Sequence, residues 1–479
     1  MQAAGDLRTG TRRPIYGIGD ILPHLFLLCM ALMLWLLFAL DVQGMSLTSL
    51  SNLASVYAIA TAIMVGQVSP QRFWSASFLY LVIFSLFHFG LTAVFGLNLP
   101  IGGTTQTNLD QWFYTPFTKE AITLSCIGLV SVGMGCLIAS LCGVRRQKLA
   151  PIPLSMPRAA RDLTVDRALC VTGAALVGVS ICGWLLIVVQ AGGAGVLFSS
   201  YESMLQVVGE STIFTLSYYG INIGTALLAA AEPSPLRRAA FLVFTLWGLL
   251  ALASGNRSEV LFPAVTALII MAKRKPLFSP RTALVLGILL LGVIAAIREV
   301  RQVGLQYAAS TTVSASPLDG LTELGSSLRP VTETVYWRAS GDPFLYGASY
   351  LEPFNRQLDS LLPGLDWKRL PAEQDPLILS SLAAMRTKGQ IGYSPIAEGY
   401  RNFGTPGVLL VMGLTGFLLG CMDSWPATPA RLALFGVVLV PILVEVRNDF
   451  TAIPFQLALG CGVLYVVVLF ARTIERTRP

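Results

Sequence analysis

Long apolar segments, separated by shorter polar ones, recur along the whole chain. Each is close to the length of about 20 residues that a helix needs to cross the hydrocarbon core of a bilayer. The pattern therefore predicts an all-α, polytopic integral membrane protein with about 12 transmembrane helices. The predicted helices cover residues 21–41, 47–67, 73–95, 121–142, 168–190, 212–231, 238–254, 257–273, 280–299, 403–422, 430–446 and 451–471.

Lysine and arginine are concentrated in alternate connections between these helices. Residues 143–167 and 274–279 are rich in them, whereas residues 42–46 and 191–211 contain none. Cytoplasmic loops of membrane proteins carry this excess of positive charge. The alternation predicts that both termini are cytoplasmic and that the connections without basic residues lie outside.

The composition excludes an ordinary soluble protein. Hydrophobic residues make up 54% of the 479 residues and charged residues 12%, with a mean hydropathy of +0.67. A soluble domain has about 25% charged residues. The net charge of +7 is ordinary for a membrane protein with basic cytoplasmic loops, and we expect no nucleic-acid partner.

The chain divides into three parts. Residues 1–299 carry the first nine predicted helices, residues 300–402 form one large loop, and residues 403–479 carry the last three helices and the tail. The loop is rich in aromatic residues and in charges of both signs, and parts of it have helical spacing. We expect it to form an extracytoplasmic cap of short helices over the membrane face.

A few arginines fall on the extracytoplasmic side of this topology, against the general bias. Basic side chains at that face suggest that an anion is bound there, and guanidinium groups bind phosphate oxygens bidentately. The arginines concerned are Arg257, Arg298, Arg301, Arg401 and Arg447.

Arg257 lies in a turn from which a predicted helix begins. Free N–H groups at a helix N-terminus bind phosphate oxygens, so Asn256 and Arg257 are candidate ligands. Arg298 and Arg301 are three residues apart and share one helix face. The alternatives are structural: Arg257 can be an interfacial side chain paired with Glu259, and the other two arginines can stabilise a helix C-terminus.

Residues 392–404 lead into the tenth predicted helix and carry a second group of polar side chains. Near the headgroup plane the pKa of the Glu398 carboxyl can rise, which suits a general base. Glu398 and Arg401 can instead form an ion pair, since they are three residues apart. Glu445, Arg447 and Asp449, at the end of the eleventh helix, fit structural pairing and function equally well.

The sequence contains no motif for a metal or nucleotide cofactor. The eight cysteines show no CxxC spacing, and the two histidines, His24 and His88, are isolated from each other. Walker and dinucleotide-binding motifs are absent from the sequence. We expect no cofactor and no metal. For His88 we favour a buried side chain bonded to a backbone carbonyl over a functional one.

Three stretches resemble the O-antigen polymerase (Wzy-type) family, also called oligosaccharide repeat-unit polymerases. They are Gly255-Asn256-Arg257, Tyr346–Leu351 followed by Leu362-Pro363, and Ser394–Gly404. One large loop before the last three helices also agrees with this family. O-antigen ligases share the architecture but usually rely on a histidine in the large loop, and residues 300–402 contain no histidine.

The resemblance implies a metal-independent glycosyltransferase of the GT-C-like membrane class in the bacterial plasma (inner) membrane. It would polymerise undecaprenyl-diphosphate-linked oligosaccharide repeat units into O-antigen or a related surface polysaccharide at the outer face. Besides this substrate, the implied partners are membrane lipids and a chain-length regulator.

Together with this resemblance, the polar groups above become candidate site residues. Glu398 would activate the acceptor hydroxyl, the arginines would hold the diphosphate, and Arg401 would orient Glu398 or a second phosphate. The candidate catalytic residues are Glu398, Arg257 and Arg298. The candidate substrate-binding residues are Asn256, Arg301, Tyr400, Arg401, Asn402 and Arg447.

Two other functions stay open at the level of the sequence. One is a flippase or transporter of lipid-linked oligosaccharides, and the other is an O-antigen ligase-like transferase. A transporter would carry charged side chains at mid-membrane depth on several helices. Here the candidate residues cluster at one predicted face, which favours the transferase.

Overall fold

The structure is a computed structural model, and it describes residues 18–39, 41–101, 109–149, 160–193, 195, 211–254, 256–275, 277–303, 316–361, 370–389 and 391–476. Over these ranges the chain is helical, with no strand. The predicted all-α class is confirmed.

Each predicted apolar segment lies on a helix, and ten helices are long and apolar enough to span a membrane within the described residues. These ten are α1 (Ile18–Ala39), α2 (Leu47–Val68), α3 (Ala76–Gly96), α5 (Phe117–Leu149), α6 (Ala160–Gln190), α9 (Thr212–Ala230), α10 (Pro235–Ala253), α12 (Pro280–Val303), α19 (Thr405–Asp423) and α21 (Ile453–Arg476).

Two further predicted spans, α11 (Ser258–Arg274) and α20 (Pro429–Glu445), are helices of 17 residues. Each contains a proline, Pro263 in α11 and Pro441 in α20. At 17 residues these two helices are shorter than the other ten. The expected number of about 12 spans is therefore supported only in part.

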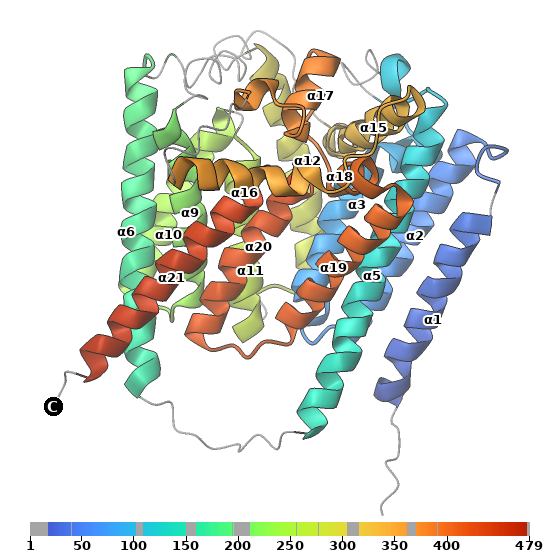
Figure 1. Cartoon of the computed structure of the whole chain (residues 1–479). Helices are drawn as coiled ribbons and strands as arrows, with labels where there is room; N and C mark the ends of the chain where they lie inside the picture. The colour runs from blue at the N-terminus through green and yellow to red at the C-terminus, as the bar shows by residue number, and fades with distance from the viewer. Residues whose placement is uncertain are drawn as a thin grey trace, which may run out of the picture.

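Short helices lie together at one end of the bundle, which we call the cap side (Figure 1). They belong to the predicted large loop and its boundary with the tenth helix. They are α14 (Pro317–Gly325), η2 (Ser326–Leu328), α15 (Arg329–Ala339), α16 (Ala348–Leu361), η3 (Ala372–Gln374), α17 (Leu379–Thr387) and α18 (Pro395–Phe403). The Ile18 end of α1 and the Arg476 end of α21 lie at the opposite end of the bundle (Figure 1).

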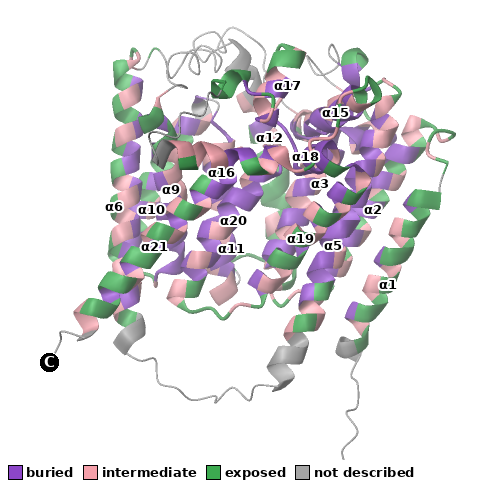
Figure 2. Cartoon of the chain, viewed as in Figure 1, coloured by how far each residue is buried: buried purple, intermediate pink, exposed green. Residues whose placement is uncertain are grey.

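The long helices form two groups that stand side by side (Figure 1). In one group α1, α2, α3 and α19 pack around α5; in the other α6, α9, α10, α11, α20 and α21 pack on one another. Buried residues are concentrated in the middle of the molecule, and the outward faces of α1 and α6 are more exposed (Figure 2). Exposed apolar side chains on outward helix faces are the expected surface of a protein surrounded by lipid.

A polar connection joins the two groups at the end opposite the cap. Asp423, at the end of α19, accepts hydrogen bonds from the N–H groups of Ala76 and Ser77 at the start of α3. Lys273 of α11 donates to the carbonyl oxygens of Met422 and Asp423, at 2.8 and 3.1 Å. Side chains therefore satisfy helix ends that would otherwise carry unpaired groups.

On the cap side α14 connects α3 with α12. A Cβ atom on Gly325 would lie 1.9 Å from the Leu91 nitrogen of α3, and one on Gly320 would lie 2.1 Å from the Leu291 oxygen of α12. Only glycine permits this backbone-to-backbone contact. The contacts fix α14 against both helices and so fix the position of Glu323, which it carries.

Candidate active site between the helix groups

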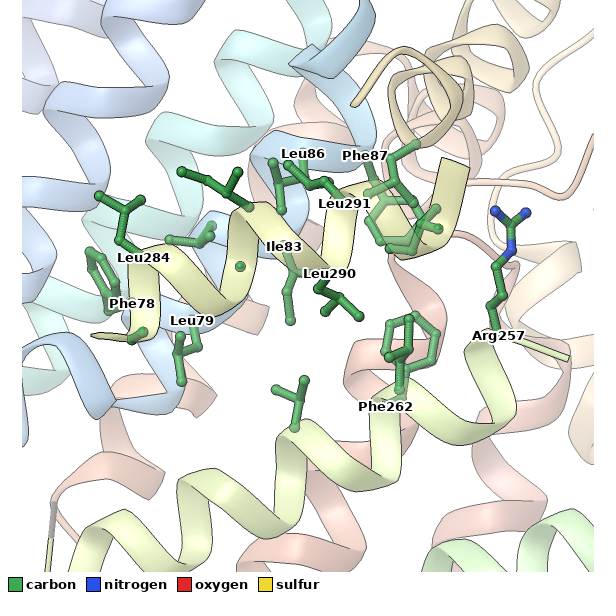
Figure 3. A pocket seen from close by; sticks show the side chains of 18 of the residues that line it. Phe78, Leu79, Ile83, Leu86, Phe87, Arg257, Phe262, Leu284, Leu290 and Leu291 are labelled. Atoms are coloured by element: carbon green, nitrogen blue, oxygen red, sulfur yellow. The ribbon is translucent and has the colours of Figure 1, made fainter. Parts of the chain in front are cut away.

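A cavity of about 450 Å³ lies between α3, α11 and α12. Apolar side chains such as Phe78, Ile83 and Leu290 form nearly all of its wall, and among the described residues the charged ones are Arg257 and Arg447. Figure 3 shows Phe78 and Leu284 toward one end of the cavity and Arg257 at the other. The cavity thus combines a long apolar part with a cationic end.

One wall of the cavity is open toward the surroundings of the bundle. In the apolar part of α12 only 11% of the residues are buried, and Leu284, which lines the cavity, is 66% exposed. A hydrophobic chain in this cavity can therefore continue into lipid beside α12.

Arg257 is held at the cationic end by an acidic residue of the cap. Its Nη2 atom lies 2.6 Å from Oε1 of Glu323, and the Arg257 side chain is only 7% exposed. The Nη1 atom of Arg257 is buried without a hydrogen-bond partner among the described residues. The pair therefore leaves one guanidinium nitrogen available to an anion. The expected alternative partner, Glu259, instead accepts from the Ser258 hydroxyl.

Asn256 supports the turn that precedes α11. Its side chain is 1% exposed, and its Nδ2 atom donates to the Ser254 hydroxyl at 3.0 Å. Asn256 directly precedes Arg257, the residue predicted to bind phosphate. Its hydrogen bond to Ser254 stabilises the turn that carries Arg257.

Arg447 reaches the same cavity from the end of α20. Its backbone carbonyl accepts a hydrogen bond from the N–H of Tyr393 at 3.0 Å. Gly392 lies next to this carbonyl with φ +70° and has room for no side chain there, because a Cβ atom would be 2.7 Å from the Arg447 oxygen. The turn at Arg447 is thus fixed to the segment that starts α18.

Glu398 of α18 is buried next to this turn, with 1% of its surface exposed. Its two carboxylate oxygens accept hydrogen bonds from the Ser349 hydroxyl at 2.7 Å and from the Phe450 N–H at 2.8 Å. Burial, together with the charge of Asp449, raises the pKa of Glu398 to about 8. A carboxyl in this range can release and accept protons near neutral pH.

Asn402 and Tyr400 connect α18 to neighbouring elements. Asn402 donates to the Ser349 hydroxyl at 2.8 Å and accepts from the Gly347 N–H at 2.8 Å. The Tyr400 hydroxyl donates to Glu120 of α5 at 2.9 Å. These two predicted substrate-binding residues therefore hold α18, which carries Glu398, against its neighbours.

The spacing of Glu398 and Arg401 within the helix suggested an ion pair between them. In the structure Arg401 pairs with another residue instead. Its Nη2 atom lies 2.8 Å from Oδ2 of Asp342 in the cap. Asp342 also accepts from Arg386 at 2.6 Å. Partial burial opposes ionisation of Asp342, but the hydrogen bonds and charges of Arg386 and Arg401 keep its pKa below the usual value. Arg401 therefore pairs with this ionised carboxylate and not with the buried Glu398.

The Asp342 cluster leaves unused hydrogen-bond donors on Arg401. The Nε and Nη1 atoms are buried without a partner among the described residues, and the side chain is 6% exposed. Arg401 is thus able to bind a second anionic or hydroxyl group, although it does not contact Glu398 directly.

Arg298 and Arg301 lie on the cap-side part of α12, but their side chains fall outside the described residues. Gly255 of the predicted phosphate-binding turn also falls outside them. The backbone places both arginines on the helix that forms the open wall of the cavity.

His88 has the environment expected from the sequence. It is fully buried in α3, with Nδ1 at 3.2 Å from the Phe84 carbonyl. Its Nε2 atom is 2.9 Å from the hydroxyl of Ser394, the N-cap of α18. His88 therefore connects α3 to the helix that carries Glu398.

Sequence reasoning missed three partners that define the site: Glu323, Asp342 and Ser349. Each is distant in sequence from the residue it contacts, so no local spacing identifies it. A partial signal existed for Glu323: Ser316 and Asp319 form a capping box that starts the short helix α14.

Comparison with known proteins agrees with this architecture. A family model described as O-antigen polysaccharide polymerase Wzy matches residues 21–477. Protein CapE of Staphylococcus aureus is 25% identical over 257 residues, which span 53% of this chain and 56% of CapE. No solved structure gives a significant match. Because the family model covers nearly the whole chain, the protein belongs to the O-antigen polysaccharide polymerase Wzy family.

Proposed function

We propose that the protein is a metal-independent membrane glycosyltransferase with a GT-C-like organisation. It polymerises undecaprenyl-diphosphate-linked oligosaccharide repeat units into O-antigen or a related surface polysaccharide at the outer face of the plasma membrane. The observation that carries this proposal is the apolar cavity that ends at Arg257 and Arg447. A polyprenyl tail fits its apolar wall, and a diphosphate fits its cationic end.

The cap side is the outer side in this proposal. Basic residues accumulate at the opposite end of the bundle, where Arg237 and Arg274 donate to the Ala231 carbonyl at the end of α9. The positive-inside bias assigns that end to the cytoplasm. Both termini then lie in the cytoplasm, and the donor diphosphate is held at the outer face.

The reaction breaks the bond between the anomeric carbon of the donor glycan and the diphosphate oxygen. The acceptor hydroxyl oxygen forms the new bond to that carbon, and its proton passes to Glu398. Undecaprenyl diphosphate leaves with additional negative charge, which Arg257 and Arg447 stabilise. Arg298 and Arg301 add positive charge from α12, while Arg401 holds the glycan or a second phosphate.

Glu398 retains the capacity to act as the base although it is hydrogen-bonded. Each carboxylate oxygen has two lone pairs and accepts one hydrogen bond within the protein. A second lone pair on either oxygen can accept the proton of the acceptor hydroxyl. Asn256, Tyr400 and Asn402 act in this scheme by positioning the loop and the helix that present Arg257 and Glu398.

The test uses purified full-length protein in proteoliposomes with a lipid-diphosphate-linked repeat unit. We expect a ladder of polymer lengths from the wild type, and loss of the ladder in Arg257→Ala and Glu398→Gln. Arg329→Ala is the matched control, because Arg329 pairs with Glu333 in α15 outside the cavity. A single glycan transfer would indicate a ligase-like enzyme, translocation without a covalent product would indicate a flippase, and unchanged ladders in both variants would contradict the site.

A further inference from the structure

Helix α16 exposes apolar side chains and buries charged ones. Leu351, Phe354 and Leu358 lie three and four residues apart, which places them on one helix face. Their side chains are 62%, 47% and 47% exposed. A helix at a protein–water boundary normally turns such a face inward.

The opposite face of α16 carries charge and is turned toward the protein. Glu352 is 7% exposed and pairs with Arg356, whose Nε atom lies 3.0 Å away. Arg356 also pairs with Asp375, the residue that follows η3. Buried ionic contacts thus hold α16 to the cap and leave its apolar face uncovered.

The position of α16 shows what borders that face. The helix lies across the cap-side ends of α20 and α21 (Figure 1) and packs against α21 and η4 (Phe450–Ala452). On α21 the exposed side chains include Phe455, Tyr465 and Phe470. The apolar face of α16 therefore lies next to a membrane-spanning helix whose exposed side chains, beginning with Phe455 near its cap-side end, include apolar ones.

We propose that α16 is an interfacial helix whose Leu351, Phe354 and Leu358 insert among the acyl chains of the adjacent leaflet. An amphipathic helix parallel to the membrane plane binds lipid in this way, with its apolar face at the boundary of headgroups and acyl chains. Here the polar face meets the protein cap, so the helix seals the cap against the bilayer.

Insertion of α16 also positions the candidate base. Ser349, in the first turn of α16, donates to Oε1 of Glu398 at 2.7 Å. Phe354 packs on Phe450 with ring centroids 6.3 Å apart, and the Phe450 N–H donates to Oε2 of Glu398 at 2.8 Å. Both hydrogen bonds to Glu398 therefore come from α16 or from a residue on which α16 packs.

The experiment uses wild-type full-length protein in nanodiscs that contain a phospholipid with a photoactivatable diazirine on its acyl chain. After illumination, peptide mass spectrometry locates the lipid adducts. We expect adducts on Leu351, Phe354 and Leu358, as on exposed residues of α21, and at least fivefold fewer on Pro353, which is buried on another face of α16. Labelled α21 with unlabelled α16 would overturn the proposal.

A variant tests the same surface independently of the proposed reaction. Leu358→Asp places a charge on the apolar face, nine residues from Ser349, and Leu358→Met, which keeps the face apolar, is its matched control. We expect Leu358→Asp to reduce adducts on Phe354 several-fold while adducts on α21 persist, and Leu358→Met to leave both unchanged. Equal adduct yields in the two variants would contradict insertion, whatever the enzymatic activity proves to be.

Discussion

At the scale of single residues, the site is defined by buried charged groups with incomplete sets of partners. Arg257 has one guanidinium nitrogen paired with Glu323 and another without a partner among the described residues. Glu398 is buried with two hydrogen bonds and the charge of Asp449 nearby. Such groups cost stability in isolation, so they are typical of sites where a ligand supplies the missing contacts.

Glu398 leads to a prediction on the pH dependence of the rate. As a general base it must be ionised, and its pKa is raised to about 8. The polymerisation rate should therefore rise with pH with a midpoint near 8. In Asp449→Asn the midpoint should move to lower pH, because the repulsion that opposes ionisation of Glu398 is removed. Initial rates measured from pH 6 to 10 check both curves.

The same shift predicts a pH dependence of stability with the opposite direction. The raised pKa means that folded Glu398 holds its proton more tightly than the unfolded chain does, so its contribution to stability is complete below pH 4.5 and is lost as pH rises toward 8. The apparent melting temperature of Glu398→Gln, relative to wild type, should rise across that interval. A constant difference between the two proteins would contradict the assignment.

The contact between Arg257 and Glu323 predicts unequal effects of two substitutions. Arg257→Ala removes a donor to the leaving diphosphate and should lower the rate about 100- to 1,000-fold. Glu323→Gln keeps an oxygen acceptor at the 2.6 Å contact and should lower the rate much less. Initial rates at saturating donor distinguish the two, and equal losses would mean that the carboxylate charge itself is required.

At the scale of elements, sequence patterns located the spanning helices because apolar length and alternating basic connections are properties of contiguous residues. Sequence patterns could not identify the partners of the site residues, because these partners are distant in sequence. Asp342 and Arg401, for example, are separated in the chain by α16, η3 and α17. The structure alone shows that the short helices bring Glu323, Asp342 and Ser349 to the arginines and to Glu398. The role of Arg298 and Arg301 in binding the diphosphate stays a prediction from the sequence.

The contact of α14 with α3 predicts a stability effect at Gly325. A methyl group there would lie 1.9 Å from the Leu91 nitrogen, so Gly325→Ala must displace α14. Overpacking of this kind costs about 1–3 kcal/mol, and the apparent melting temperature in detergent should fall. Gly462→Ala on α21 is the control, because a Cβ atom there meets nothing within 4 Å; a melting temperature that changes equally in both would contradict the close contact.

At the scale of the whole molecule, two groups of helices stand side by side and the cavity occupies the space between them. Its walls come from α3 in one group, α11 in the other, and the poorly buried α12. Figure 3 shows how few polar groups interrupt the apolar wall before Arg257. This arrangement combines an apolar part and a cationic part within one site.

A substitution that fills the cavity tests this arrangement. Gly287 of α12 lines the cavity, and a Cβ atom there meets nothing within 4 Å. Gly287→Leu should therefore occupy the space of the tail without a clash and raise KM for the lipid-linked donor about tenfold, with an unchanged melting temperature. The matched variant Gly462→Leu, on α21, should leave KM unaltered. A KM equal to that of wild type in both proteins would exclude this cavity as the binding site of the tail.

The glycine contacts of α14 make the two ends of this site mechanically dependent. Because α14 touches the backbones of both α3 and α12, it could not keep both contacts if the space between those helices widened, and a shift of α14 would carry Glu323 with it. A bulkier hydrocarbon would then draw the carboxylate away from Arg257 and leave the guanidinium with a stronger attraction for phosphate. The thickness of the lipid would in this way regulate how firmly its headgroup is held.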